Sequence, residues 1–78
     1  MLYDPHLDLF LQVAELGSFS KAAEAGYITP SAVIKQINLL EDELGVRLFE
    51  RTHRGLKLTK AGESLKKDAP ELIRMSRE

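Results

Sequence analysis

Residues 29–44, TPSAVIKQINLLEDEL, have the pattern of one amphipathic helix. Thr29 is a suitable N-cap, and Pro30 suits the first helical position because its missing N–H would have no partner there. Ile34 lies at the edge of the polar face. Gly45 is expected to end the helix. The apolar face falls within one narrow arc of the helical wheel, formed by Val33, Ile37, Leu40 and Leu44.

A shorter helix is predicted directly upstream, over SFSKAAEAG at residues 18–26. Ser18 or Ser20 can accept a hydrogen bond from the N–H groups at its start, and Gly26 can end it. Two short helices joined by a tight turn, the second of them amphipathic, form a helix-turn-helix pattern. This pattern alone indicates DNA binding only weakly, because many proteins that do not bind DNA contain such helix pairs.

The first helix is predicted between Pro5 and Gly17, with Asp4 as its cap. Its apolar residues recur at i, i+3, i+4 and i+7, and further leucines and a valine widen the stripe. So broad an apolar surface indicates a helix that is covered on more than one side. The residues expected in the core of the fold are Phe10, Leu11, Phe19, Leu48 and Phe49.

Downstream, residues 46–59 read VRLFERTHRGLKLT and predict a β-hairpin. Leucines alternate with polar residues at the period of a strand, and Gly55 tolerates the positive φ that a tight turn requires. Arg51, His53 and Arg54 are expected around the tip. They belong to the most basic part of the chain, because residues 47–60 contain five basic residues and one acidic residue.

This basic segment is hidden in the net charge of the whole chain, which is −1. Residues 1–46 contain two basic and seven acidic residues, and the remaining residues balance. A concentrated positive segment attracts phosphate, although most charged segments are simply solvated surface. The acidic run at 41–43 is expected to be such a solvated helix end. Arg47 and Arg51 could bind DNA or pair with Glu43 or Glu50.

A last helix is predicted from Thr59, which can cap it, towards Glu78. Pro70 lies inside it, and an interior proline costs about 3 kcal/mol, so we expect a kink or break near residues 67–70. Asp68 can cap a restarted helix, with Glu71 at the matching capping-box position. An apolar seam needs a cover, and a second copy of the chain is the simplest one. The seam comprises Leu65, Ala69, Leu72 and Ile73.

The length of 78 residues and the composition are those of one small globular domain. The absence of cysteine fits a cytoplasmic protein, and the apolar runs are far shorter than the ~20 residues that span a bilayer. We find no carboxylate pair, glycine-rich phosphate loop, Ser/His/Asp set or cluster of metal ligands. The sequence therefore predicts neither an enzyme nor a metal or cofactor site.

Residues 7–62 resemble the N-terminal DNA-binding domain of LysR-type transcriptional regulators. The resemblance depends on FLQVAELGSFSKAA at residues 10–23 and on SAVxKQIxxLExELGVRLFERTxRGxxLTxAG at residues 31–62. It implies a mainly α fold, a winged helix-turn-helix with three helices and a two-stranded wing over residues 1–59. A linker helix over residues 60–78 would pair two subunits. It also implies bacterial transcription control.

The family's effector-binding domain is not contained in these 78 residues, so an effector would act only through such a domain. The chain is either a fragment or an unusually short relative. The resemblance implies double-stranded DNA as the partner, with the second amphipathic helix in the major groove and the wing on the minor groove or backbone. The implied contacts are Ser20, Lys21, Thr29, Pro30, Ser31, Ile34, Lys35, Asn38, Arg51, His53 and Arg54.

Three of these positions depart from the family pattern, which commonly has glutamine, serine and arginine where this chain has Pro30, Ile34 and Lys35. Pro30 and Ile34 cannot form hydrogen bonds to bases, although isoleucine can pack against a thymine methyl group. Base readout should therefore depend on methyl contacts, the wing and DNA shape. An alternative is a protein-interaction module that has lost sequence readout. Gly26 stands where the family usually has a core leucine, and this should loosen the second helix unless Tyr27 fills the gap.

Overall fold

The computed structural model describes residues 5–77. They form α1 (Pro5–Leu16), α2 (Phe19–Gly26), α3 (Pro30–Leu44), β1 (Phe49–Thr52), β2 (Gly55–Leu58) and α4 (Lys60–Arg77). The mainly α architecture, with a two-stranded wing and a C-terminal helix, is therefore confirmed. Asp4, the predicted cap of α1, lies outside the described residues. None of the helices within residues 5–77 is both long and apolar enough to cross a bilayer.

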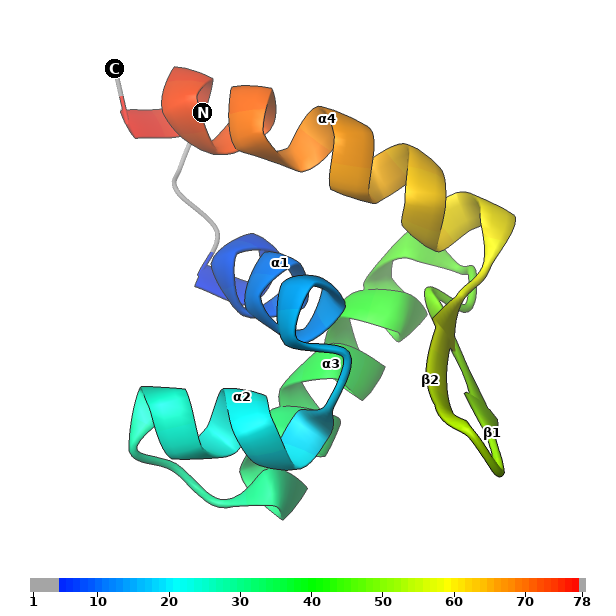
Figure 1. Cartoon of the computed structure of the whole chain (residues 1–78). Coiled ribbons are helices and arrows are strands. Elements are labelled where there is room, and N and C mark those ends of the chain that lie inside the picture. The colour runs from blue at the N-terminus through cyan, green and yellow to red at the C-terminus, as the bar shows by residue number, and fades with distance from the viewer. Residues whose placement is uncertain (1–4, 78) are drawn as a thin grey trace.

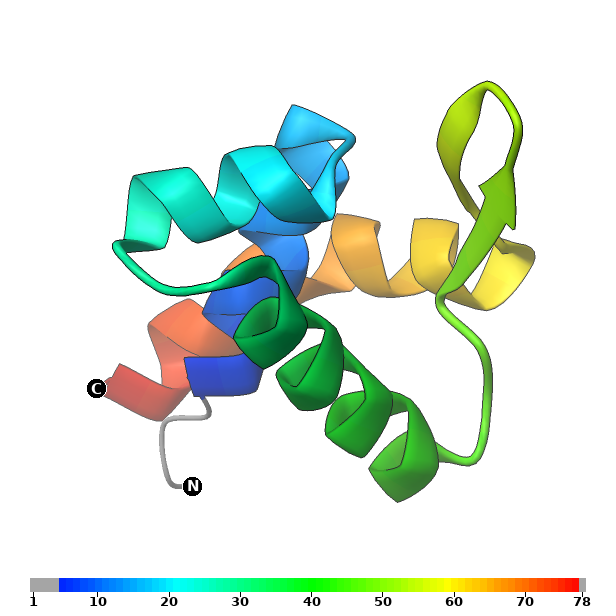
Figure 2. The same ribbon diagram turned by 90° about the horizontal axis from the view of Figure 1, so that it is seen from below.

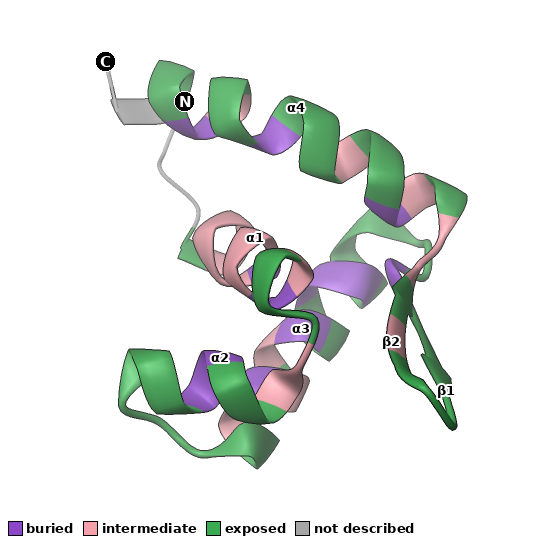
Figure 3. Ribbon diagram, viewed as in Figure 1, coloured by how far each residue is buried: buried purple, intermediate pink, exposed green. Residues whose placement is uncertain are grey.

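Helix α1 lies in the middle of the molecule, between α4 on one side and the α2–α3 pair on the other (Figure 1). Buried residues occur in α1, α2, α3 and α4 and at the start of β1 (Figure 3). Phe10, Leu48 and Phe49 are buried as predicted, whereas Leu11 and Phe19 are only partly buried and pack against the core. The broad apolar surface of α1 thus reflects its contacts on more than one side.

The caps of the helices follow the sequence closely. The Ser18 hydroxyl accepts from the Lys21 N–H, the Thr29 hydroxyl from the Ala32 N–H and the Thr59 hydroxyl from the Gly62 N–H. Ser18, rather than Ser20, is therefore the cap of α2. Gly17 and Gly45 adopt the positive φ predicted for residues that end a helix.

The end of α2 differs from the prediction. Gly26 is the last helical residue, and the left-handed position is Tyr27, with φ of 57°. A tyrosine is rare in this conformation, because its Cβ crowds the backbone there. Its side chain is 96% exposed, so Tyr27 does not fill the space left by the missing leucine.

One residue of the apolar arc of α3 is not buried. Leu44 is 49% exposed, although Val33, Ile37 and Leu40 are buried as expected. The helix ends at Leu44, so this last residue extends past the core. Glu41 is buried on this side of the helix instead.

The last helix is not broken, because α4 continues without interruption through Pro70. A kink at this proline stays a prediction. The missing N–H of Pro70 removes one helical hydrogen bond, but Ala69 and Ile73 on either side are buried where α4 packs on α1. The stabilisation from this packing offsets the cost of the hydrogen bond that is lost at Pro70. The packing also assigns Ala69 and Ile73 to the core of the single chain, so their side chains offer no free surface to a second copy.

The first turn of α4 touches the base of the wing at Gly62, which is buried. A Cβ at this position would lie 2.2 Å from the carbonyl oxygen of Leu48 and 2.9 Å from Cδ2 of Leu58. Only glycine therefore permits the backbone of α4 to approach the hairpin this closely.

We expect Gly62→Ala to lower the free energy of unfolding by about 1–3 kcal/mol, because the new methyl group meets a backbone atom that cannot move freely. Urea unfolding measures this change. Gly26→Ala is the matched control, since its Cβ would lie 3.7 Å from Cγ1 of Ile28, an ordinary contact, and its φ is not positive. The control should stabilise the chain by about 0.5–1 kcal/mol. Unchanged stability of Gly62→Ala would contradict the close approach.

Candidate nucleic-acid interface

The outer face of α3 carries the polar side chains that the sequence assigned to DNA. Ser31, Lys35 and Asn38 follow one another at i, i+4 and i+7 and are all exposed. Ile34 is half-buried at the edge of this face. An α-helix with its side chains is about 10–12 Å across, which matches the width of the major groove of DNA, about 12 Å. The exposed face of α3 therefore has the shape and the polar groups to read base edges.

The hairpin projects beside this helix and turns at His53 and Arg54. Its strands pair in antiparallel register from Phe49 opposite Leu58 to Thr52 opposite Gly55. The Thr52 hydroxyl donates to the Gly55 carbonyl at 3.0 Å and accepts from the Arg54 N–H at 3.2 Å. Gly55 has φ of 118°, as the tight turn requires. The exposed side chains of His53 and Arg54 are thus presented at the tip of an ordered turn.

An aromatic cluster fixes the base of the hairpin in the core. The Phe49 ring lies 5.4 Å from the Phe10 ring and 6.0 Å from the Phe19 ring, measured between centroids. Tilted and edge-to-face pairs at these distances stabilise a fold beyond the burial of their area. Phe49 therefore connects the first residue of the wing to α1 and to the start of α2.

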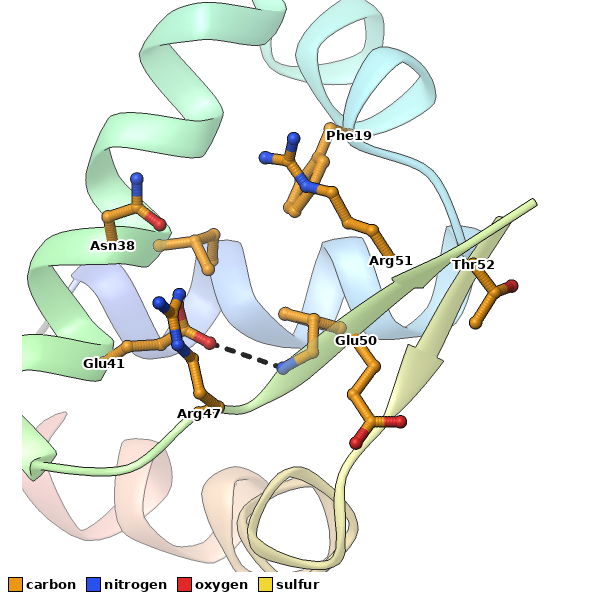
Figure 4. Close-up of a pocket in the computed structure, with 9 residues that line it drawn as sticks. Phe19, Asn38, Glu41, Arg47, Glu50, Arg51 and Thr52 are labelled. Carbon is orange, nitrogen blue, oxygen red and sulfur yellow. Dashed lines mark hydrogen bonds and ion pairs between the residues drawn. The ribbon is translucent and has the colours of Figure 1, made fainter. Parts of the chain in front are cut away.

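The buried carboxylate of Glu41 fixes the hairpin to α3. Its Oε2 accepts hydrogen bonds from the Leu48 N–H at 2.7 Å and the Phe49 N–H at 3.4 Å, and its Oε1 lies 3.6 Å from Nη1 of Arg47. Figure 4 shows the side chains of Glu41 and Arg47 beside each other, between α3 and the start of β1. The expectation that residues 41–43 form a solvated helix end is therefore wrong for Glu41. Arg47 pairs with Glu41, and not with Glu43 or Glu50.

Arg51 has a structural contact as well as an exposed charge. Its guanidinium carbon lies 5.1 Å from the centroid of the Phe19 ring, which is the geometry of a cation–π contact (Figure 4). The contact joins β1 to the start of α2. It holds a positive charge at the surface between the hairpin and the helix pair.

Two neighbouring grooves run between α3 and the hairpin. One is bordered by Pro30 and Ile34 of α3, Ser20 of α2, and Arg51 and Gly55 of the wing. The other groove begins beside it, and both are lined by Phe19, Arg51 and Thr52. Asn38 lines the second groove.

The tip of the hairpin and the start of α3 lie at the end of the molecule opposite α4 (Figure 1). Figure 2 views this end, with α3 across the front and α2 and the hairpin beside it. The structure thus brings the start of α3, the start of α2 and the wing to one surface. Of the remaining predicted contacts, Lys21 is exposed in the first turn of α2, and the Thr29 hydroxyl is engaged as the cap of α3.

Glu41 and Gly62 also position this surface, and the sequence did not predict this role for either residue. Glu41 follows the buried Ile37 by four residues, so the helical period places it beside the apolar arc. That spacing is a signal that a buried carboxylate was possible, but its partners are backbone groups that no pattern of side chains reveals. Gly62 carries no such signal, because a close backbone approach depends on the tertiary structure.

Comparison with known proteins gives a consistent result. The family described as bacterial regulatory helix-turn-helix protein, lysR family, matches residues 5–63. The chain is 42% identical over 74 residues, 95% of its length, to a probable HTH-type transcriptional regulator LtrA of Klebsiella pneumoniae. That alignment covers 24% of LtrA, so the chain spans about a quarter of the length of such relatives.

Solved structures agree with the sequence relatives. The crystal structure of a CbnR_DBD–DNA complex matches with a TM-score of 0.86 and 36% identity, over 92% of this chain and 83% of that one. The complex of BenM_DBD with catB site 1 DNA matches with a TM-score of 0.84 and 38% identity, over 90% of this chain and 79% of that one. The described fold is therefore similar to folds that have been crystallised on DNA.

We expect Glu41→Ala to lower the free energy of unfolding by about 1–3 kcal/mol, because the Leu48 and Phe49 N–H groups lose their carboxylate acceptor. Chemical unfolding followed by circular dichroism measures the loss. Glu43→Ala removes an exposed carboxylate from the same helix and should change stability by less than about 0.5 kcal/mol. Equal effects of the two substitutions would show that the buried carboxylate does not hold the wing.

Proposed function

The chain belongs to the LysR family of bacterial regulatory helix-turn-helix proteins, and we propose that it binds double-stranded DNA as a module of a transcriptional regulator. The observation that carries this proposal is the common surface of α3 and the wing. The first turn of α3 and the wing border the same groove, and Ser20 of α2 lies there too. The DNA complexes formed by the similar CbnR and BenM domains support the proposal.

In this proposal α3 enters the major groove with Ser31, Lys35 and Asn38 facing the bases or the adjoining phosphates. Arg54 reaches the neighbouring minor groove or its phosphates from the tip of the wing. The N-terminus of α2 contributes Ser20 and Lys21, because the free N–H groups of a first helical turn favour a phosphate. Thr29 acts mainly as the cap that orients this end of α3.

We further propose that residues 1–59 are the DNA-binding domain and that residues 60–78 begin a linker helix that pairs two copies. Because Ala69 and Ile73 are covered by the chain itself, the pairing would depend on the partly covered Leu65 and Leu72 and on the exposed Met75. Two copies would place two α3 helices on a two-fold related site. The proposed location is the cytoplasm, and any effector would act through a domain beyond these residues.

Binding to duplex DNA should weaken steeply with salt, because every neutralised phosphate releases about 0.9 of a counterion. We expect Arg54→Ala to weaken binding about tenfold and to reduce the slope of log affinity against log salt by about 0.9. Fluorescence anisotropy at several salt concentrations measures both quantities.

Lys67→Ala is the matched control. Lys67 is exposed on α4, so this substitution removes one positive charge at a position away from the groove. It should leave the slope nearly unchanged. If the parent chain binds no duplex even at low salt, the proposal fails. If Arg54→Ala and Lys67→Ala have equal small effects, the surface is better explained as a site for a protein partner.

A further inference from the structure

The start of α3 presents apolar side chains to the proposed DNA surface. Pro30 and Ile34 lie one helical turn apart and line the same groove, together with Gly55 and Leu56 of the wing. Ile34 is half-buried, so one part of its side chain packs inward and another part is open to the groove. Neither side chain can donate or accept a hydrogen bond.

Two hydroxyl groups at the start of α3 are already engaged with each other or with the backbone. The Thr29 hydroxyl accepts from the Ala32 N–H at 3.2 Å and lies 3.2 Å from the hydroxyl of Ser31. The leading turn of α3 therefore offers few unoccupied groups that could bind the polar edge of a base. A polar base edge placed against Ile34 would lose water without gaining a partner, and this is unfavourable.

We propose that Ile34, supported by Pro30, recognises the C5-methyl group of a pyrimidine in the major groove; this inference rests on the DNA binding proposed above. The C5-methyl of thymine is the one apolar feature that the four ordinary base pairs display in that groove. 5-Methylcytosine carries the same methyl group on the same ring carbon. The preferred ligand is thus a duplex with a 5-methylpyrimidine, either thymine or 5-methylcytosine, opposite Ile34.

The test begins with a duplex selected from random DNA by the 78-residue chain at low salt. Each thymine is replaced in turn by deoxyuridine, which removes one methyl group and leaves the hydrogen-bonding groups unchanged. At one position in each half-site we expect affinity to fall about fourfold, the factor expected for one buried methyl-sized group. At the same position a 5-methylcytosine pair should bind more tightly than an unmethylated cytosine pair.

The ratio between thymine and deoxyuridine duplexes is then measured for variants of the chain. Ile34→Ser should bring the ratio at that position close to one, whereas Ile34→Val should retain part of it. Leu39→Ser is the matched control, because Leu39 is an exposed apolar residue of the same helix that does not line the groove. It should keep the full ratio. Circular dichroism confirms that each variant is folded before its ratio is used.

The outcomes separate this inference from the proposed function. If the parent chain binds no duplex, both are overturned. If it binds but no thymine position responds to loss of the methyl group, only the methyl recognition is overturned. If the response persists in Ile34→Ser, the methyl group acts through DNA shape or through another residue, and the assignment to Ile34 is wrong.

Discussion

The carboxylate of Glu41 is the contact on which the arrangement of the proposed DNA surface depends. Burial of a carboxylate is unfavourable unless hydrogen bonds replace its water. Here the Leu48 and Phe49 N–H groups donate those hydrogen bonds, and the Arg47 guanidinium pairs with the charge as an ion pair. Since residues 45–48 alone separate α3 from β1, this contact fixes where the hairpin begins relative to the helix. The helix and the wing therefore approach a ligand as one preorganised unit, which reduces the entropy lost on binding.

The other side of the hairpin base is fixed by the start of α4. The Thr59 N–H donates to the Leu48 carbonyl at 3.1 Å, and its hydroxyl donates to the Arg47 carbonyl at 2.6 Å. The close approach of Gly62 to the Leu48 carbonyl belongs to the same junction. An isolated two-stranded hairpin is marginal in water, so its order must come from such contacts at its base. The residues at the tip are therefore not needed for the order of the hairpin, and they can be polar and exposed.

Short sequence patterns correctly predicted the features that depend on interactions between neighbouring residues. The caps Thr29 and Thr59 follow from short-range hydrogen bonds and were correct. Errors arose where a distant element decides the outcome. Glu41 is buried because the hairpin returns to it, and α4 continues through Pro70 because α1 covers that part of it. The residues of the candidate surface were suggested by family resemblance, but the groove that joins α3 to the wing required the tertiary structure.

The structure also suggests how affinity and specificity are divided. Phosphate contacts supply affinity that is independent of sequence, and contacts to base edges supply discrimination. The positive charge of this chain is concentrated at residues 47–60, whereas the open edge of α3 includes the apolar Pro30 and Ile34. If α3 and the wing were joined flexibly, the wing could contact the DNA backbone in many registers. A single apolar contact could not select among those registers. Glu41 and Phe49 hold the wing in one position relative to α3. Contacts of the wing with the DNA backbone therefore also determine which base lies opposite Ile34. A small contact can then discriminate between sites, since the rigid junction excludes the alternative registers.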